Sequence, residues 1–312
     1  MIAAVLIGCA ARLGHPVVEF GAGPAVLPLV TTSADRERAY VGVDVPGQGT
    51  WVFFFDTGYA WSACDDGLAR ALALDPRGRV RTRGTLGAVR APVAVLPDLW
   101  IGGHRVSGLH CTVRDLATTS SIRDPEEVRV AGVLGSDVLA RFGLVWRPEG
   151  AVELHAPTEP LSLDGLSTFD VRREHRPGRR PRIPLDVGDE RVWAVIDTGS
   201  NGTLVRNLDV PGSEERVALR GSGAGDADVR VVMRWDVDVQ LGGRPLGLAS
   251  LRSTSGPALV GLDLLGDRPV VLDLARGIGG VGDVAPDAGR PLWSEMDEPV
   301  LRFDAPSRNG VR

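Results

Sequence analysis

The chain has 312 residues and a mass of 33.1 kDa, about twice the length of a typical domain of ~150 residues, so we first expect two domains. Hydrophobic residues make up 43% of the chain and charged residues 24%, a balance that excludes an intrinsically disordered protein. The net charge of −5 argues against a nucleic-acid-binding protein, which usually has a basic surface. Forty glycines and 22 prolines favour a turn-rich, mostly β architecture.

The N-terminal segment, residues 1–34, begins with apolar and small residues. Residues 6–9, Leu-Ile-Gly-Cys, resemble the lipobox of bacterial lipoproteins, in which the cysteine is lipidated after export. The segment is short for a signal peptide and lacks a positively charged start. Two interpretations stay open: an exported protein (periplasmic, cell-envelope or secreted) with a lipid anchor at Cys9, or a cytoplasmic protein with an ordinary N-terminal tail. No run of 18 apolar residues predicts a membrane-spanning helix.

One ordered set of features occurs twice along the chain. In each copy a hairpin of two apolar strands ends in Asp-Thr-Gly, at residues 56–58 and again at residues 197–199. A Gly-Gly turn follows, then an apolar strand that ends in Gly-x-Asp, then a further pair of strands. Because four features match in the same order, the sequence predicts an internal duplication.

This repeat sets the expected domain boundaries. We expect the first lobe over residues 35–156, a linker over 157–180, the second lobe over 181–284 and a C-terminal tail over 285–312. The linker is rich in Arg, Pro and Ser, and its basic cluster is interpreted as a solvated face rather than a binding site. The two Gly-x-Asp aspartates, Asp137 and Asp263, are predicted to cap short helices.

Two Asp-Thr-Gly strands in one chain resemble the aspartic peptidases of the pepsin and retroviral-protease kind. The Gly-x-Asp continuation is similar to the retropepsin-type domains of bacteria. The resemblance covers roughly residues 35–283. It implies an all-β, two-lobed acid-protease fold with few short helices, peptide or protein substrates, no cofactor, and a monomer, since both lobes lie in one chain.

The resemblance assigns Asp56 and Asp197 as the catalytic pair. Peptide hydrolysis needs a base that deprotonates water and an acid that protonates the carbonyl oxygen. Two carboxyls within about 3 Å of each other cannot both ionise, so they share one proton and supply both functions. We therefore predict a bell-shaped, acid-shifted pH profile.

The residues that follow each aspartate are expected to support the catalytic loops. Gly58 and Gly199 would permit close backbone approach. By resemblance, Thr57 and Thr198 would hydrogen-bond across the lobe interface, and the hydroxyl of Ser200 would bond the carboxylate. The first copy has Tyr59 where the family has Ser or Ala. Its hydroxyl is expected to point elsewhere, or its ring to intrude on the cleft.

A hairpin is expected to cover the substrate in each lobe. In the first lobe it spans residues 80–89, with Arg83, Gly84 and Thr85 as substrate-binding candidates. In the second it spans residues 219–226, with Gly223 at a glycine-rich tip.

Two cysteines, Cys64 and Cys111, fall in the first lobe. If the protein is exported, a disulfide between them is expected, and otherwise two buried thiols. His104, His110 and Cys111 lie close in sequence but lack the spacing of a zinc site, and we expect no metal. The sequence thus predicts an aspartic endopeptidase, with a catalytically weak peptide-binding protein of the same fold as the alternative.

Overall fold

The computed structural model describes residues 14–32, 35–83, 88–116, 130–174, 180–200, 202–205, 213–220, 228–253 and 257–284. Strands dominate this part of the chain, and its helices are three short ones: α1 (Asp66–Ala71), α2 (Ser136–Leu139) and α3 (Leu262–Leu265). The prediction of an all-β fold with few short helices is confirmed. In the described ranges no helix is long and apolar enough to cross a membrane.

The first half of the chain forms a sheet of eleven described strands in the order β1-β10-β9-β4-β5-β12-β6-β11-β8-β7, with β3 paired to β4. Their bounds are β1 (Val17–Glu19), β3 (Val30–Thr32), β4 (Asp35–Val45), β5 (Gly49–Phe55), β6 (Ala63–Asp65), β7 (Arg79–Arg83), β8 (Ala88–Val95), β9 (Leu99–Ile101), β10 (His104–Ser107), β11 (His110–Arg114) and β12 (Gly132–Leu134).

The second half forms a sheet of eight described strands in the order β16-β17-β18-β23-β19-β22-β21-β20. Their bounds are β16 (Arg172–Arg173), β17 (Pro181–Val187), β18 (Glu190–Ile196), β19 (Leu204–Val205), β20 (Ser213–Arg220), β21 (Asp228–Leu241), β22 (Arg244–Ser253) and β23 (Leu259–Val260). Side chains alternate between buried and partly exposed along β17, as the two-residue period of a strand on a one-sided core requires.

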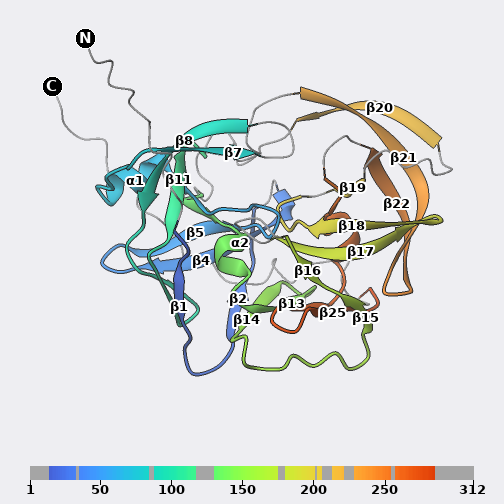
Figure 1. Cartoon of the computed structure of the whole chain (residues 1–312), viewed down its shortest axis with the longest axis horizontal. Helices are drawn as coiled ribbons and strands as arrows, with labels where there is room; N and C mark the ends of the chain where they lie inside the picture. Colours follow the sequence, from blue (N-terminus) through green and yellow to red (C-terminus); the bar gives the residue numbers. More distant parts are fainter. Residues whose placement is uncertain are drawn as a thin grey trace, which may run out of the picture.

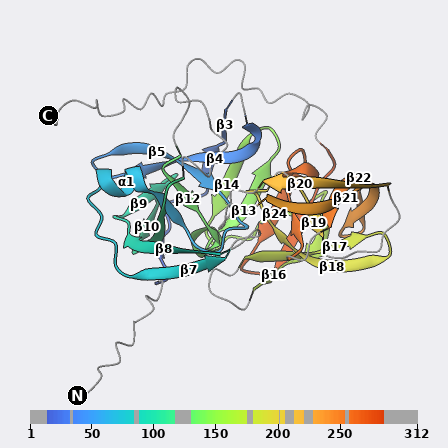
Figure 2. The same cartoon turned by 90° about the horizontal axis from the view of Figure 1, so that it is seen from above.

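A third sheet of six strands joins the two halves. Its order is β15-β25-β24-β13-β14-β2, with bounds β2 (Ala25–Pro28), β13 (Gly143–Arg147), β14 (Ala151–His155), β15 (Ser167–Asp170), β24 (Val270–Asp273) and β25 (Ile278–Val281). The halves meet where β13 pairs with β24, with Leu144 opposite Leu272. Figure 1 shows this sheet along the lower side with a large sheet to each side above it, and Figure 2 shows its middle strands between the two halves.

The predicted N-terminal segment and linker are more ordered than expected. β1 adds to the first large sheet and β2 to the six-stranded sheet, where Ala25 and Leu27 are buried. The linker contributes β15 and β16. Short strands of two to four residues have too little periodicity to be recognised in a sequence. The lipobox residues, including Cys9, and the C-terminal tail from residue 285 lie outside the described residues.

The predicted duplication reappears as a repeated pairing pattern. The strand before each Asp-Thr-Gly pairs in parallel with the strand before each Gly-x-Asp: β5 with β12, and β18 with β23. A parallel pair also follows in each half, β6 with β11 and β19 with β22. One apolar core cluster runs through both halves and includes Phe55, Ile196 and residues of the six-stranded sheet. The two Asp-Thr-Gly loops therefore end on strands that are fixed in a shared core.

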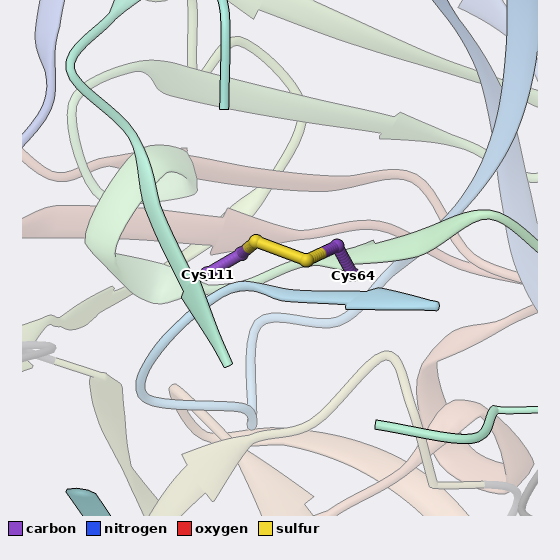
Figure 3. The surroundings of a disulfide bond; sticks show 2 residues. All are labelled: Cys64 and Cys111. Carbon is purple, nitrogen blue, oxygen red and sulfur yellow. A yellow bond between two sulfur atoms is a disulfide. The ribbon is translucent and has the colours of Figure 1, made fainter. Parts of the chain in front are cut away.

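The first large sheet contains a disulfide between Cys64 on β6 and Cys111 on β11 (Figure 3). The Cα atoms are 5.6 Å apart, both side chains are fully buried, and the bond closes 47 residues of sequence. Of the two alternatives from the sequence, the structure has the bonded pair. Cys64 lies eight residues after Asp56, so the bond anchors the chain that leaves the first Asp-Thr-Gly loop.

Replacing both cysteines, Cys64→Ala with Cys111→Ala, should lower the free energy of unfolding by about 3–4 kcal/mol. The bond closes a long loop in the unfolded chain and so lowers the conformational entropy of the unfolded state, and the double variant loses this effect. Denaturant unfolding without reductant measures the loss. Cys9→Ser is the matched control and should leave the midpoint unchanged. Equal midpoints for the double variant and the unmodified protein would contradict this role of the bond.

Candidate active site

The two Asp-Thr-Gly loops leave their strands in the same way. Asp56 follows β5 directly, and its backbone N–H donates to the carbonyl of Leu134 on β12 at 3.1 Å. Asp197 follows β18, and its N–H donates to the carbonyl of Val260 on β23 at 3.0 Å. Each aspartate is thereby held at the end of a parallel strand pair, on a rigid part of the fold.

The glycines after the two aspartates show how closely the loops approach. A Cβ atom on Gly58 would lie 2.1 Å from the carboxyl carbon of Asp197, and one on Gly199 would lie 2.4 Å from that of Asp56. No side chain fits at such distances, so glycine is required at both positions. The structure thus places each carboxyl against the glycine of the other half, and the two carboxyls meet.

Two threonines exchange hydrogen bonds across the interface between the halves. The N–H of Thr57 donates to Oγ1 of Thr198 at 3.1 Å, and the N–H of Thr198 donates to Oγ1 of Thr57 at 3.2 Å. Each hydroxyl also donates to a carbonyl of the opposite half at 2.7 Å, that of Ile196 or Phe55. Both threonines are buried. The cross-interface bonds implied by the family resemblance are therefore present, and they keep the loops in register.

Backbone N–H groups bind both carboxyls. Oδ1 of Asp56 accepts from Gly58 and Tyr59, each at 2.9 Å, and Oδ1 of Asp197 accepts from Gly199 at 3.0 Å. Asp56 is buried and Asp197 is partly buried. Burial raises the pKa of Asp56 well above its ordinary value, and the charge of Asp197 raises it further. Burial also raises the pKa of Asp197, while its hydrogen bond with Asp56 acts in the opposite direction.

A small cavity lies behind the two loops. Its volume is about 30 Å³, and its wall is almost entirely apolar, with Phe55, Trp146 and Leu272 among the lining side chains. Asp197 lines it, which places apolar surface against one side of the carboxyl and accounts for part of its desolvation.

Two of the predicted loop contacts are different in the structure. The hydroxyl of Ser200 donates to the carbonyl of Gly202 at 2.7 Å and does not bond the carboxylate as predicted, because this backbone acceptor lies close to it. The backbone N–H of Ser200, and not its hydroxyl, binds the Asp197 carboxyl. The hydroxyl of Tyr59 accepts from Arg114 at 2.6 Å, and its ring packs beside an apolar cluster around Tyr40. Of the two positions considered for Tyr59, its hydroxyl points elsewhere.

The Gly-x-Asp aspartates fix the chain just after each Asp-Thr-Gly loop. Asp137 accepts from the N–H and hydroxyl of Ser62 at 3.0 and 2.8 Å. Asp263 accepts from the N–H and hydroxyl of Thr203, both at 2.8 Å. The helix caps predicted for these aspartates are wrong, because Gly135 and Gly261 occupy the N-cap positions.

Ser62 and Thr203 were missed at the sequence level. A signal for them exists: each is a hydroxyl residue six positions after its Asp-Thr-Gly aspartate.

Each half has a hairpin where a substrate-covering element was expected. β7 pairs with β8, and β20 with β21. Arg83 is the last residue of β7 and pairs with Ala88. Gly84, Thr85 and Gly223 lie outside the described residues. β7 and β20 are the outer strands of their sheets, and Figure 1 shows both hairpins on the upper side, away from the six-stranded sheet.

The described part of the basic cluster around the start of β17 is partly exposed and also makes contacts within the fold. Arg172 stacks on Trp193 at 3.9 Å from the ring centre, and Arg173 donates to the carbonyl of Leu274. Arg180 forms an ion pair with Glu174 and donates to the carbonyl of Gly58 at 3.3 Å. The contacts with Leu274 and Gly58 join segments far apart in sequence, so the sequence contained no signal for them.

Within the described ranges, the acidic groups close enough to hold a metal are Asp65, Asp66 and Asp115. Asp65 already accepts from the N–H groups of Gly67 and Leu116. His104, considered at the sequence level, accepts from the N–H of Gly21 at 3.0 Å and lies 3.3 Å from the carbonyl of Leu154. We therefore assign these groups to the fold.

Asp137 should make the stability of the protein depend on pH. Burial raises its pKa from 3.8 to about 6, so the native state binds its proton more tightly than the unfolded chain does, and stability falls as pH rises from 4 through 6. Relative to the unmodified protein, Asp137→Asn should gain about 2 kcal/mol of unfolding free energy between pH 4 and pH 7, since the carboxyl of the unfolded chain is already partly ionised at pH 4. Denaturant unfolding at several pH values measures this, and Asp75→Asn, at an exposed carboxylate, is the control. A difference that does not change with pH would contradict it.

Comparison with known proteins agrees with this geometry. Residues 41–138 match a family model described as aspartyl protease, a range that contains the first Asp-Thr-Gly loop and the first Gly-x-Asp motif. No curated protein matches the chain. Residues 41–138 are thus similar to the aspartyl proteases, and the match supports the resemblance to aspartic peptidases of the pepsin and retropepsin kind.

Proposed function

We propose that this protein is an aspartic endopeptidase that hydrolyses peptide bonds with a water activated between Asp56 and Asp197. The observation that carries the proposal is the reciprocal approach of the loops, in which each Asp-Thr-Gly glycine lies against the carboxyl of the other half. The family match supports protease chemistry. The second Asp-Thr-Gly, outside the matched range, supplies the second carboxyl that this chemistry needs.

The proposed reaction uses one proton on the pair. The ionised carboxylate takes a proton from the water as the water oxygen bonds to the scissile carbonyl carbon. The neutral carboxyl gives its proton to the carbonyl oxygen, which forms a tetrahedral diol. A proton then passes from the pair to the peptide nitrogen, and one diol hydroxyl returns a proton to the other carboxylate. The C–N bond breaks, and a carboxylic acid and an amine leave with one proton again on the pair.

An extended peptide is the substrate form that the fold favours. The outer strands β7 and β20 each belong to a hairpin at the edge of a large sheet. Such edges have main-chain groups that can pair with an added strand. We propose that the substrate backbone lies between these two hairpins and above the dyad, with the side chains of the substrate in alternating positions.

The disulfide supports the exported interpretation of the N-terminus. Structural disulfides persist in oxidising compartments and are rare in the cytosol of most organisms. The Cys64–Cys111 bond is buried in the first large sheet, so it belongs to the folded state. We therefore propose a periplasmic, cell-envelope or secreted protein.

The test is the separate substitution Asp56→Asn and Asp197→Asn, each assayed against a mixed peptide library between pH 3 and 8. Each variant should lose at least about a thousandfold in kcat/KM, because an amide neither accepts the proton of the water nor donates one as an acid. Asp75→Asn, at an exposed carboxylate, should retain full activity.

Hydrolysis by either dyad variant at the unmodified rate would contradict the proposal. Peptide binding by the unmodified protein without cleavage at any pH would instead identify a peptide-binding protein of this fold. The unmodified protein should show a bell-shaped profile, since activity requires one proton on the pair and is lost when the pair holds none or two.

A further inference from the structure

We propose that Arg180 decides which aspartate carries the shared proton: its guanidinium keeps the negative charge on Asp197, so that Asp197 is the base and Asp56 the acid. This inference rests on the proposed function and deepens it by giving the two carboxyls separate roles. Arg180 is a positioning residue here, since it acts on the reaction through Asp197.

The guanidinium of Arg180 is held from two directions. Nε and Nη2 donate to the two carboxylate oxygens of Glu174, both at 2.9 Å, in a two-pronged pair. Nη1 donates to the carbonyl of Gly58 at 3.3 Å. Only about a fifth of each side chain of the ion pair is exposed. A planar guanidinium bound in this forked way has little freedom to turn, so its charge has a fixed position.

That position is beside Asp197. Gly58 is the residue whose Cα lies directly against the Asp197 carboxyl, and its carbonyl is the group that Arg180 binds. Gly58 is thus the only residue between the Arg180 guanidinium and the Asp197 carboxyl along this path of contacts. A cation this near stabilises the ionised form of a desolvated carboxylate, because little water screens the attraction between the two charges. Consistent with this, the positive charge of Arg180 lowers the pKa of Asp197 against the effect of burial.

Asp56 has a different set of neighbours. The charge of Asp197 and the hydrogen bond between the two carboxyls both raise the pKa of Asp56, in addition to burial, and the N–H groups of Tyr59 and Gly58 oppose them. Among the described residues, the charged and titratable groups near the pair include Arg180 with its partner Glu174, and Tyr59 with its partner Arg114. Tyr59 and Arg114 lie on the side of Asp56, where the Tyr59 hydroxyl already accepts from Arg114. Arg180 is the cation of this set that favours the ionised form of Asp197.

An exposed arginine on the same sheet provides the control. The side chain of Arg191 on β18 is 67% exposed and pairs with Asp186. Arg191→Gln therefore removes a cation at the surface of the second half.

The first experiment measures kcat/KM against pH for Arg180→Gln, Arg180→Lys and Arg191→Gln. Arg180→Gln should move the acidic limb of the profile upward by about one pH unit, as loss of a neighbouring opposite charge does. Arg180→Lys keeps the charge and should restore most of that limb. Arg191→Gln should leave the limb in place. A pH-independent loss in Arg180→Gln, or an equal shift in Arg191→Gln, would overturn the assignment.

The second experiment does not depend on activity. Double-mutant cycles in the free energy of unfolding at pH 7 combine Arg180→Gln with Asp197→Asn and, separately, with Asp56→Asn. The coupling should be larger with Asp197. Equal coupling, or larger coupling with Asp56, would overturn the proposal. If both dyad variants still hydrolysed peptides, the proposed function would fail while this cycle still gave its answer about Arg180.

Discussion

The exchange of hydrogen bonds between Thr57 and Thr198 is the contact that the site depends on. Each threonine uses its backbone N–H and its hydroxyl on the opposite half, so neither half can form this arrangement alone. The exchange fixes the distance between the two loops. At this distance a Cβ atom at position 58 or 199 would clash with the carboxyl of the other half, so both positions require glycine. With glycine at both positions, the two carboxyls can approach each other. The proposed shared proton rests on that meeting, because two carboxylates side by side and shielded from water repel each other strongly.

Holding two carboxyls in an apolar place costs stability at neutral pH. The fold offsets this cost with a core that is continuous through both halves and with a six-stranded sheet to which both halves contribute. Asp137 and Asp263 add local rigidity by binding the chain six residues after each catalytic aspartate. The site is thus destabilising by itself and is stabilised by elements that take no part in the chemistry.

The parts of this molecule that could be predicted are those whose sequence pattern occurs in both halves of the chain. The two Asp-Thr-Gly strands, the hairpins and the Gly-x-Asp strands all have local patterns that occur twice, and the pairing of β5 with β12 and of β18 with β23 follows them. β15 and β16 were missed because strands of two to four residues are too short to show the alternation of apolar and polar residues that predicts a strand. The partners of Ser200, Tyr59 and Arg180 were missed for a different reason. Each of these side chains had several acceptors or donors within reach, and only the packed structure selects among them.

The central claim is that Asp56 and Asp197 hold one proton between them, and carbon-13 NMR of labelled aspartate carboxyls tests it most directly. The account predicts that, near pH 6, one carboxyl of the pair is neutral and the other ionised, and that Asp56→Asn or Asp197→Asn changes the titration of the remaining partner. Two aspartates that ionise independently at ordinary pKa values near 4, with neither affected by loss of the other, would contradict it.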